Sequence, residues 1–185
     1  CLLESVEHGE RWSRFSFVGR NPRATLELVD GRIRVTGDIP TSVPTDRGML
    51  AAIEGLLAEY RSPVIADLPP LQGGVMGFLG YDIVREVESL PNVPADDRHL
   101  PDAVMSVIGS LAAFDHWRQR VYMIESVPTL GLDNHGLRAE YEAAGARALQ
   151  AVADLARPLP YTPVEPPSRD DVLPEAVSSM GDGSY

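Results

Sequence analysis

A two-residue turn near the start of the chain, Asp30-Gly31, constrains the fold more than any other short feature. It separates two runs in which apolar and polar residues alternate, Ala24 to Val29 and Arg32 to Thr36. Asp-Gly accepts the left-handed backbone that a tight hairpin requires, and a period of two is typical of a strand with one buried face. A third alternating run, Trp12 to Val18, precedes them. The amino-terminal part of the chain therefore predicts an antiparallel sheet.

Two segments have the periodicity of amphipathic helices. In the first, apolar residues between Met49 and Tyr60 recur on one helical face, and Thr45 or Asp46 is the expected cap. The second runs from Asn134 to Arg157, begins at an Asn or Asp cap and is stopped by a proline. Its expected buried face consists of apolar residues at steps of three and four: Leu137, Tyr141, Ala144, Ala148, Val152 and Leu155.

The segment between these helices predicts short strands. The glycine-rich stretch from Gly73 to Asp82 indicates a buried strand whose glycines let another backbone approach closely, and a brief helix is expected at Tyr81 to Val87. Two long strands are expected at Val104 to Phe114 and Arg120 to Glu125. The order of elements favours the α+β class, with a mainly antiparallel sheet covered by helices.

A change in composition marks the expected domain boundary. Six prolines fall within the seventeen residues from Pro158 to Pro174, which is typical of a semi-rigid linker and not of a core. We therefore expect an amino-terminal lobe at 1–157, followed by a Pro-rich linker and tail at 158–185.

The charge of the chain excludes two classes of partner. The net charge is −11, from 27 acidic and 16 basic residues, and all of the basic residues are Arg. Such a field repels phosphate backbones and anionic lipids, so neither nucleic acid nor a membrane is an expected partner. The single cysteine, Cys1, cannot form an internal disulfide, and no apolar run approaches the roughly 20 residues that span a bilayer. A cytoplasmic location is expected.

Self-contained catalytic machinery is not evident in the sequence. The four histidines lack metal-ligand spacing, and the lone cysteine has no spaced histidine partner. Asp82 and Glu86 could share one helical face as a pair of catalytic carboxylates, but a solvated face with local pairing to Arg85 is the favoured interpretation. We expect neither catalytic residues nor metal ligands within this chain.

Three stretches of sequence together carry a resemblance to a known family. They are "LLESVEHGERWSRFSFVG" from Leu2, "GGVMGFLGYDIVREVESLP" from Gly73 and "LPDAVMSV" from Leu100. The chain resembles, from Cys1 to about Val127, the amino-terminal region of the large component of anthranilate synthase.

The resemblance implies an activity for a longer subunit. In that family, chorismate and ammonia form anthranilate and pyruvate, a lyase reaction that uses Mg²⁺ and belongs to tryptophan biosynthesis. The ammonia comes from glutamine through a partner amidotransferase subunit. The residues that bind chorismate and magnesium are implied to lie in a carboxy-terminal catalytic half, outside this chain.

The resemblance also implies a role in feedback inhibition for three residues. Glu4 and Ser5 are similar to ligands for the ammonium and carboxylate groups of the allosteric effector L-tryptophan, and Arg14 matches a basic position of the same pocket. Charge-assisted hydrogen bonds of this kind are strong when they are buried. The alternative is that Glu4 and Ser5 only cap a turn.

Two other functions stay open on the sequence alone. The large component of aminodeoxychorismate synthase shares the expected fold and similar motifs. A stand-alone amino-acid-binding regulatory module is the alternative from a different class, although a Pro-rich linker after the last helix favours a following lobe.

Overall fold

The computed structural model describes residues 1–4, 6–7, 11–12, 14–93, 95–158, 162 and 168. Internal contacts separate a first unit, Cys1–Leu155, from a second, Ala156–Tyr185. The first unit is described below. The predicted linker and tail at 158–185 lie outside the described residues apart from Pro158, Thr162 and Ser168.

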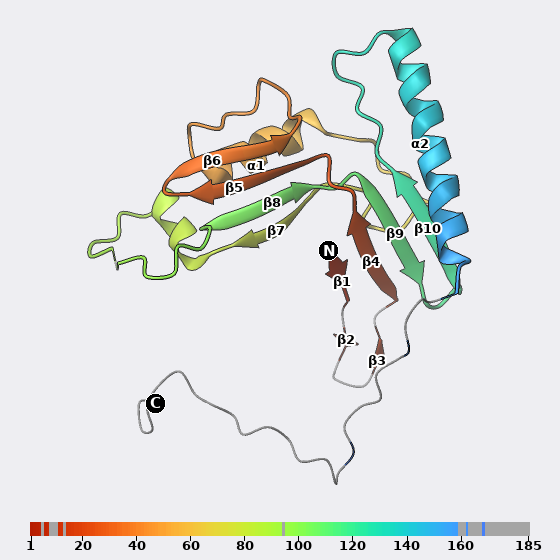
Figure 1. Ribbon diagram of the computed structural model, residues 1–185, viewed down its shortest axis with the longest axis horizontal. Helices are drawn as coiled ribbons and strands as arrows, with labels where there is room; N and C mark the ends of the chain where they lie inside the picture. The colour runs from red at the N-terminus through yellow and green to blue at the C-terminus, as the bar shows by residue number, and fades with distance from the viewer. Residues whose placement is uncertain are drawn as a thin grey trace. The chain divides into compact units, whose positions relative to one another are not determined.

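The described part of the first unit alternates strands with two α-helices and one 3₁₀ helix (Figure 1). In chain order the elements are β1 (Leu2–Leu3), β2 (Val6–Glu7), β3 (Arg11–Trp12), β4 (Phe15–Arg20), β5 (Ala24–Val29), β6 (Arg32–Gly37), α1 (Met49–Glu59), β7 (Val75–Leu79), η1 (Tyr81–Glu86), β8 (Ala103–Val107), β9 (Ser110–Asp115), β10 (Arg120–Glu125) and α2 (Asn134–Leu155). The predicted α+β class is confirmed.

Two four-stranded antiparallel sheets replace the single sheet that the sequence suggested. Sheet A has the strand order β1-β4-β9-β10, and sheet C has the order β6-β5-β8-β7. Strands β2 and β3 form a separate two-stranded ladder. The predicted hairpin at Asp30-Gly31 is confirmed, because Val29 pairs with Arg32 and both turn residues have positive φ, 51° and 70°.

One bent ribbon of two long antiparallel segments connects the sheets. Strands β4 and β5 follow each other in the chain, as do β8 and β9; β4 pairs with β9 in sheet A and β5 pairs with β8 in sheet C. The last pair of sheet A is Arg20 with Ser110, and the first pair of sheet C is Ala24 with Val107. Three residues on one segment therefore oppose two on the other, which is the arrangement of a β-bulge.

The expected continuous strand from Val104 to Phe114 is wrong, because this bulge divides it into β8 and β9. Gly109 lies between them, and a Cβ added to it would overlap the carbonyl oxygen of Asn21 on the opposite segment. Only glycine permits that approach. Alternation of apolar residues alone could not reveal the break, since both halves are apolar.

The main core lies between sheet C and α1. Alternate residues of β5 and β8 face the helix, and the apolar stripe of α1 is buried against them. The core residues are Ala24, Leu26, Leu28, Val43, Met49, Ala52, Leu56, Ile83, Ala103, Met105 and Val107. The periodicity that predicted α1 thus corresponds to its packed face.

The predicted cap of α1 is wrong. The helix begins after Gly48 and has no side-chain cap from its own segment. Instead, the carboxylate of Glu86, at the end of η1, accepts hydrogen bonds from the backbone N–H groups of Met49 (2.7 Å) and Leu50 (2.9 Å). A carboxylate there also complements the positive end of the helix dipole.

The predicted local pairing of Arg85 is confirmed, because its Nε lies 2.6 Å from Oδ1 of Asp82.

Helix α2 lies alongside sheet A, but most of its expected buried face is exposed. Its start is capped as predicted, since Asp133 accepts a hydrogen bond from Gly136 N (2.7 Å). Only small residues are buried on it, Ala144 and Ala151, whereas Tyr141 and Val152 are exposed. Small side chains let the helix pack closely on the sheet, which leaves the larger apolar residues beside the contact and not in it.

Strand β7 is an edge strand and not the buried strand expected from its glycines. Among the described strands it pairs only with β8, and its carboxy-terminal half is exposed. The predicted close approach is confirmed at Gly77, where an added Cβ would overlap the carbonyl oxygen of Val104.

Gly109→Ala should destabilise the protein, because the new methyl group overlaps Asn21 at the bend. We expect a loss of about 1–3 kcal/mol in the free energy of unfolding, the usual range for overpacking. That corresponds to roughly 2–4 °C in Tm for each kcal/mol. The matched control is Gly145→Ala in α2, where no described atom beyond the adjacent residues and the helix's own backbone lies within 4 Å of the added Cβ. It should stabilise by about 0.5–1 kcal/mol; equal effects of the two changes would contradict the bend.

Glu86→Ala should destabilise α1, because it removes two hydrogen bonds from the first turn. We expect a loss of about 1–2 kcal/mol, similar to the loss of a side-chain cap. Denaturant unfolding followed by circular dichroism measures it. The control is Glu88→Ala, an exposed acid of the same segment, and a comparable loss in that variant would contradict the capping role of Glu86.

Candidate functional site

The first predicted site segment lies at the edge of sheet A. Strand β1 pairs with β4, with Leu2 opposite Val18 and Leu3 opposite Phe17. Glu4 follows this strand directly and is exposed. Ser5 lies outside the described residues, so its predicted role stays a prediction.

Arg14 lies just before β4 and pairs with Asp115 at the end of β9. The pair is bidentate: Nε donates to Oδ1 at 3.1 Å and Nη2 donates to Oδ2 at 2.7 Å. The Arg14 side chain is 34% exposed and the Asp115 side chain is 1% exposed. The Arg14 guanidinium thus compensates the charge of the buried Asp115 carboxylate. The N–H donors on Nη1 of Arg14 take no part in this pair.

Asp115 is ionised in the folded protein over a wide pH range. The pKa of Asp115 is lowered from 3.8 to about 2, mainly by the hydrogen bond from Arg14. Burial of the carboxylate raises this pKa, and the hydrogen bond from the N–H group of Arg118 lowers it further. The N–H groups of Trp117 and Arg118 donate to Oδ1 at 3.2 and 3.1 Å. The carboxylate therefore holds both Arg14 and the turn after β9.

Aromatic rings and a small cavity surround the Arg14 guanidinium. Its central carbon lies 4.7 Å from the centroid of the Phe15 ring and 5.5 Å from that of Trp117, which allows cation–π attraction. A cavity of about 370 Å³ lies here, bordered by Arg14, Asp115, Tyr122 and the segment 64–70. Its volume falls within the range of small-molecule sites.

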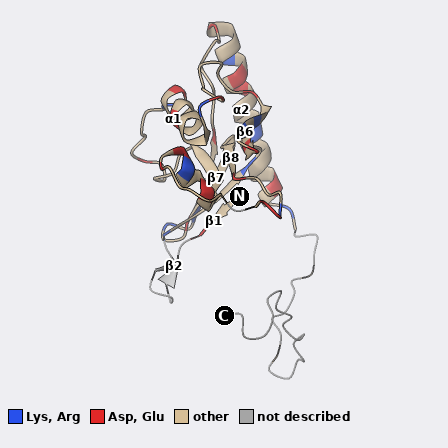
Figure 2. Cartoon of the chain, turned by 90° about the vertical axis from the view of Figure 1, so that its left-hand side faces the viewer, with Lys and Arg blue, Asp and Glu red and all other residues tan. Residues whose placement is uncertain are grey.

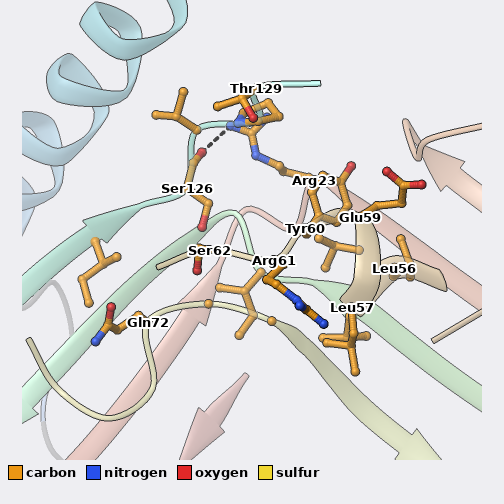
Figure 3. A pocket seen from close by; sticks show the side chains of 18 of the residues that line it. Arg23, Leu56, Leu57, Glu59, Tyr60, Arg61, Ser62, Gln72, Ser126 and Thr129 are labelled. Carbon is orange, nitrogen blue, oxygen red and sulfur yellow. Dashed lines mark hydrogen bonds between the residues drawn. The ribbon is translucent and has the colours of Figure 1, made fainter. Parts of the chain in front are cut away.

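A second cavity, of about 510 Å³, lies at the carboxy-terminal end of α1 (Figure 3). The helix contributes Leu56 and Leu57 to its wall, and the segments 60–75 and 124–130 supply most of the rest. Burial raises the pKa of the Tyr60 hydroxyl at this wall. In Figure 3 the side chain of Arg23 extends toward Ser126, whose carbonyl oxygen accepts a hydrogen bond from its Nη2.

Ion pairs connect this second cavity to α2. Arg23 donates to Glu140 at 3.0 Å, and Arg147 donates to both Glu140 (3.0 Å) and Glu125 (3.1 Å). Hydrogen bonds from Arg23, which has the larger effect, and from Arg147 lower the pKa of Glu140. The network stabilises the position of α2 beside β10, because its charges come from both elements and from the segment before β5.

Asp115 is the site residue that sequence reasoning missed. The sequence shows it only as the acid that ends an apolar run, "SLAAFD", and such an acid is common before a turn. Its pairing with Arg14 joins positions 101 residues apart. The structure thus places Arg14 beside a carboxylate that the prediction did not include, and no described contact joins Glu4 to it.

Two kinds of feature are absent from the described residues. Within that part of the chain, no group of three or more His, Cys, Asp or Glu side chains is placed to hold a metal ion. None of its helices is long and apolar enough to cross a membrane.

Comparison with known proteins identifies the family that the chain resembles. It is 33% identical over 173 residues to anthranilate synthase component 1 of Arthrobacter globiformis, which covers 91% of this chain and 32% of that protein. This chain matches the amino-terminal region of anthranilate synthase component 1. The protein of the same name from Thermus thermophilus is 39% identical over 165 residues, or 89% of this chain and 32% of that protein. No protein-family model matches the chain.

A solved structure of the same name shares the fold. It is anthranilate synthase component I from Streptococcus pneumoniae, with a TM-score of 0.60 and 25% sequence identity. The match covers 85% of this chain and 32% of that one. The chain spans about a third of the length of the anthranilate synthase component 1 proteins that it matches.

Asp115→Asn should remove a pH-dependent contribution to stability. Because folding lowers the pKa of Asp115 from 3.8 to about 2, its ionised form stabilises the folded state above pH 3.8. That contribution is lost as the pH falls through about 2. The variant should therefore be less stable than the parent at neutral pH, and the difference should shrink between about pH 4 and pH 2.

Denaturant unfolding at a series of pH values measures this difference. The control is Asp97→Asn, which changes an exposed acid and should leave the pH dependence close to that of the parent. A stability difference for Asp115→Asn that stays constant from neutral pH down to pH 2 would contradict the ionised pair.

Proposed function

We propose that this chain is the amino-terminal lobe of an anthranilate synthase large subunit. The observation that carries the proposal is the match of about 90% of the chain to proteins of that name, at 33–39% identity. The proposed subunit is a lyase of tryptophan biosynthesis. It converts chorismate and ammonia to anthranilate and pyruvate, and a glutamine amidotransferase partner supplies the ammonia.

The catalytic residues are proposed to lie in the part of the subunit outside this chain. The described residues contain no group suited to hold a metal ion, so we assign no ligand of the implied Mg²⁺ to them and derive no step through it. The contribution of this chain to the reaction is then structural and regulatory.

The regulatory part of the proposal places L-tryptophan near Glu4, Ser5 and Arg14. Three properties of the Arg14 environment support it: a cation, aromatic rings beside that cation, and a cavity of about 370 Å³. The carboxylate of an amino acid could bind the Nη1 side of the guanidinium while Asp115 holds the opposite side. Asp115 is then a positioning residue for Arg14.

Anthranilate formation by the complete subunit that contains this sequence tests the activity. With chorismate, magnesium and ammonia, we expect fluorescent anthranilate from the complete subunit and none from the 185-residue chain alone. Formation of aminodeoxychorismate in place of anthranilate would contradict the proposal, and so would anthranilate formation by the chain alone.

Ser5→Ala in the complete subunit tests the regulatory site. A lost hydrogen bond to a charged group costs about 1.5–3 kcal/mol, so the inhibitory tryptophan concentration should rise roughly 10- to 150-fold. The Michaelis constant for chorismate should change little, because inhibition reflects only the difference in tryptophan affinity between two conformations.

Two observations separate this site from the alternatives. Ser62→Ala changes the wall of the second cavity, at the carboxy-terminal end of α1, and should leave inhibition unchanged; weaker inhibition in that variant alone would move the effector to that cavity. If Ser5→Ala lowers the melting temperature without weakening inhibition, Ser5 only caps a turn.

A further inference from the structure

The two edges of sheet C differ in a way that points to a partner for one of them. Strand β6 forms one edge and carries Arg32 and Arg34, whereas β7 forms the other with the sequence Val-Met-Gly-Phe-Leu. Charges and prolines on an edge strand discourage pairing with further strands. Strand β6 has this protection and β7 has none, and β7 is drawn without charged residues in Figure 2.

The backbone of β7 is ready to accept another strand. Gly80 N donates to Asp102 O at 2.7 Å, and Ile108 N donates to Gly74 O at 2.9 Å, which sets the pattern of bonds to β8. In an antiparallel pair the backbone groups of alternate residues face the partner. Met76 and Phe78 therefore face β8, and the N–H and C=O groups of Val75, Gly77 and Leu79 face outward; no described strand pairs with them.

The side chains at this edge are also incompletely covered. Phe78 is 51% exposed and Leu79 is 45% exposed. Successive residues of a strand point to opposite faces of the sheet, so both faces of sheet C lack cover at this end of β7. Tyr81, the first residue of η1, is exposed beside them. An apolar edge strand that is uncovered on both faces is typical of a strand that lies in the interior of a larger sheet.

We propose that a strand from the part of the subunit outside this chain pairs with the outer edge of β7. This inference rests on the proposed function, since the related proteins are about three times as long as this chain, which covers 32% of them. The pairing segment should be extended, apolar on alternate residues, and free of proline where it bonds to Val75, Gly77 and Leu79. Sheet C would then continue beyond β7, while Arg32 and Arg34 keep the β6 edge in solvent.

Amide hydrogen exchange, resolved to single residues, tests the inference by comparing the 185-residue chain with the complete subunit. The N–H groups of Gly77 and Leu79 should exchange rapidly in the chain and at least about 100-fold more slowly in the complete subunit. The matched control is Val35 on β6, whose pairing with Leu26 places its N–H group on the outer side of that strand. Its exchange should be rapid in both.

A pair of variants tests the same edge without relying on exchange. Leu79→Lys introduces a charge at the β7 edge, and Val35→Lys introduces one at a residue of β6 with similar exposure, 37% against 45%. In the complete subunit, Leu79→Lys should lower Tm by several degrees, at roughly 2–4 °C for each kcal/mol lost, and restore rapid exchange at Gly77. In the 185-residue chain it should change Tm little. Val35→Lys should have no such effect in either protein.

Each outcome separates this inference from the proposed function. Equally rapid exchange of the β7 amides in both proteins would overturn the inference, even if the complete subunit forms anthranilate. The β7 amides could instead exchange slowly in the isolated chain, and still more slowly as the protein concentration rises. That result would assign the edge to a second copy and overturn the inference as well. Protection of β7 in a complete subunit that forms no anthranilate would support the inference and contradict the proposed activity instead.

Discussion

The contact between Gly109 and the carbonyl group of Asn21 determines the arrangement on which both sheets depend. Here the ribbon of β4–β5 and β9–β8 bends, and the register of its two halves differs by one residue. Every other strand of sheets A and C attaches to this ribbon, β1 and β10 on one side of the bend and β6 and β7 on the other. The candidate sites follow from the same bend: Arg14 and Asp115 lie at the far end of sheet A, and Arg23 lies at the bend itself.

Charged side chains from distant parts of the chain position both helices. Glu86 closes the first turn of α1, and the pairs among Arg23, Glu125, Glu140 and Arg147 hold α2 beside β10. Surface ion pairs contribute little to stability one at a time, but networks with partly buried members can fix an orientation. Because α2 buries only Ala144 and Ala151, these charges do much of what a larger apolar contact would do elsewhere.

The sequence predicted local features well, because they depend on neighbouring residues. The hairpin at Asp30-Gly31 and the extents of α1 and α2 agree with the structure to within two residues. Features that need a distant partner were missed or wrong. Glu86 as the cap of α1, Asp115 as the partner of Arg14 and the break at Gly109 all depend on a second segment that no local period reveals. The same reason explains β7 and α2, whose apolar patterns predict burial although the described residues leave both elements partly uncovered.

The bent ribbon also has a consequence for the order in which the chain folds. The β5–β6 hairpin and the two helices form from residues near one another, but pairing of β4 with β9 must join positions as far apart as Arg14 and Asp115, 101 residues in sequence. Loop closure over such a distance costs entropy before any contact repays it, which slows folding. During synthesis β4 and β5 therefore leave the ribosome long before their partners in the ribbon, β9 and β8, have been made. Sheet A can be completed only after β9 has emerged, so β4 spends that interval with β1 beside it but without its other final neighbour.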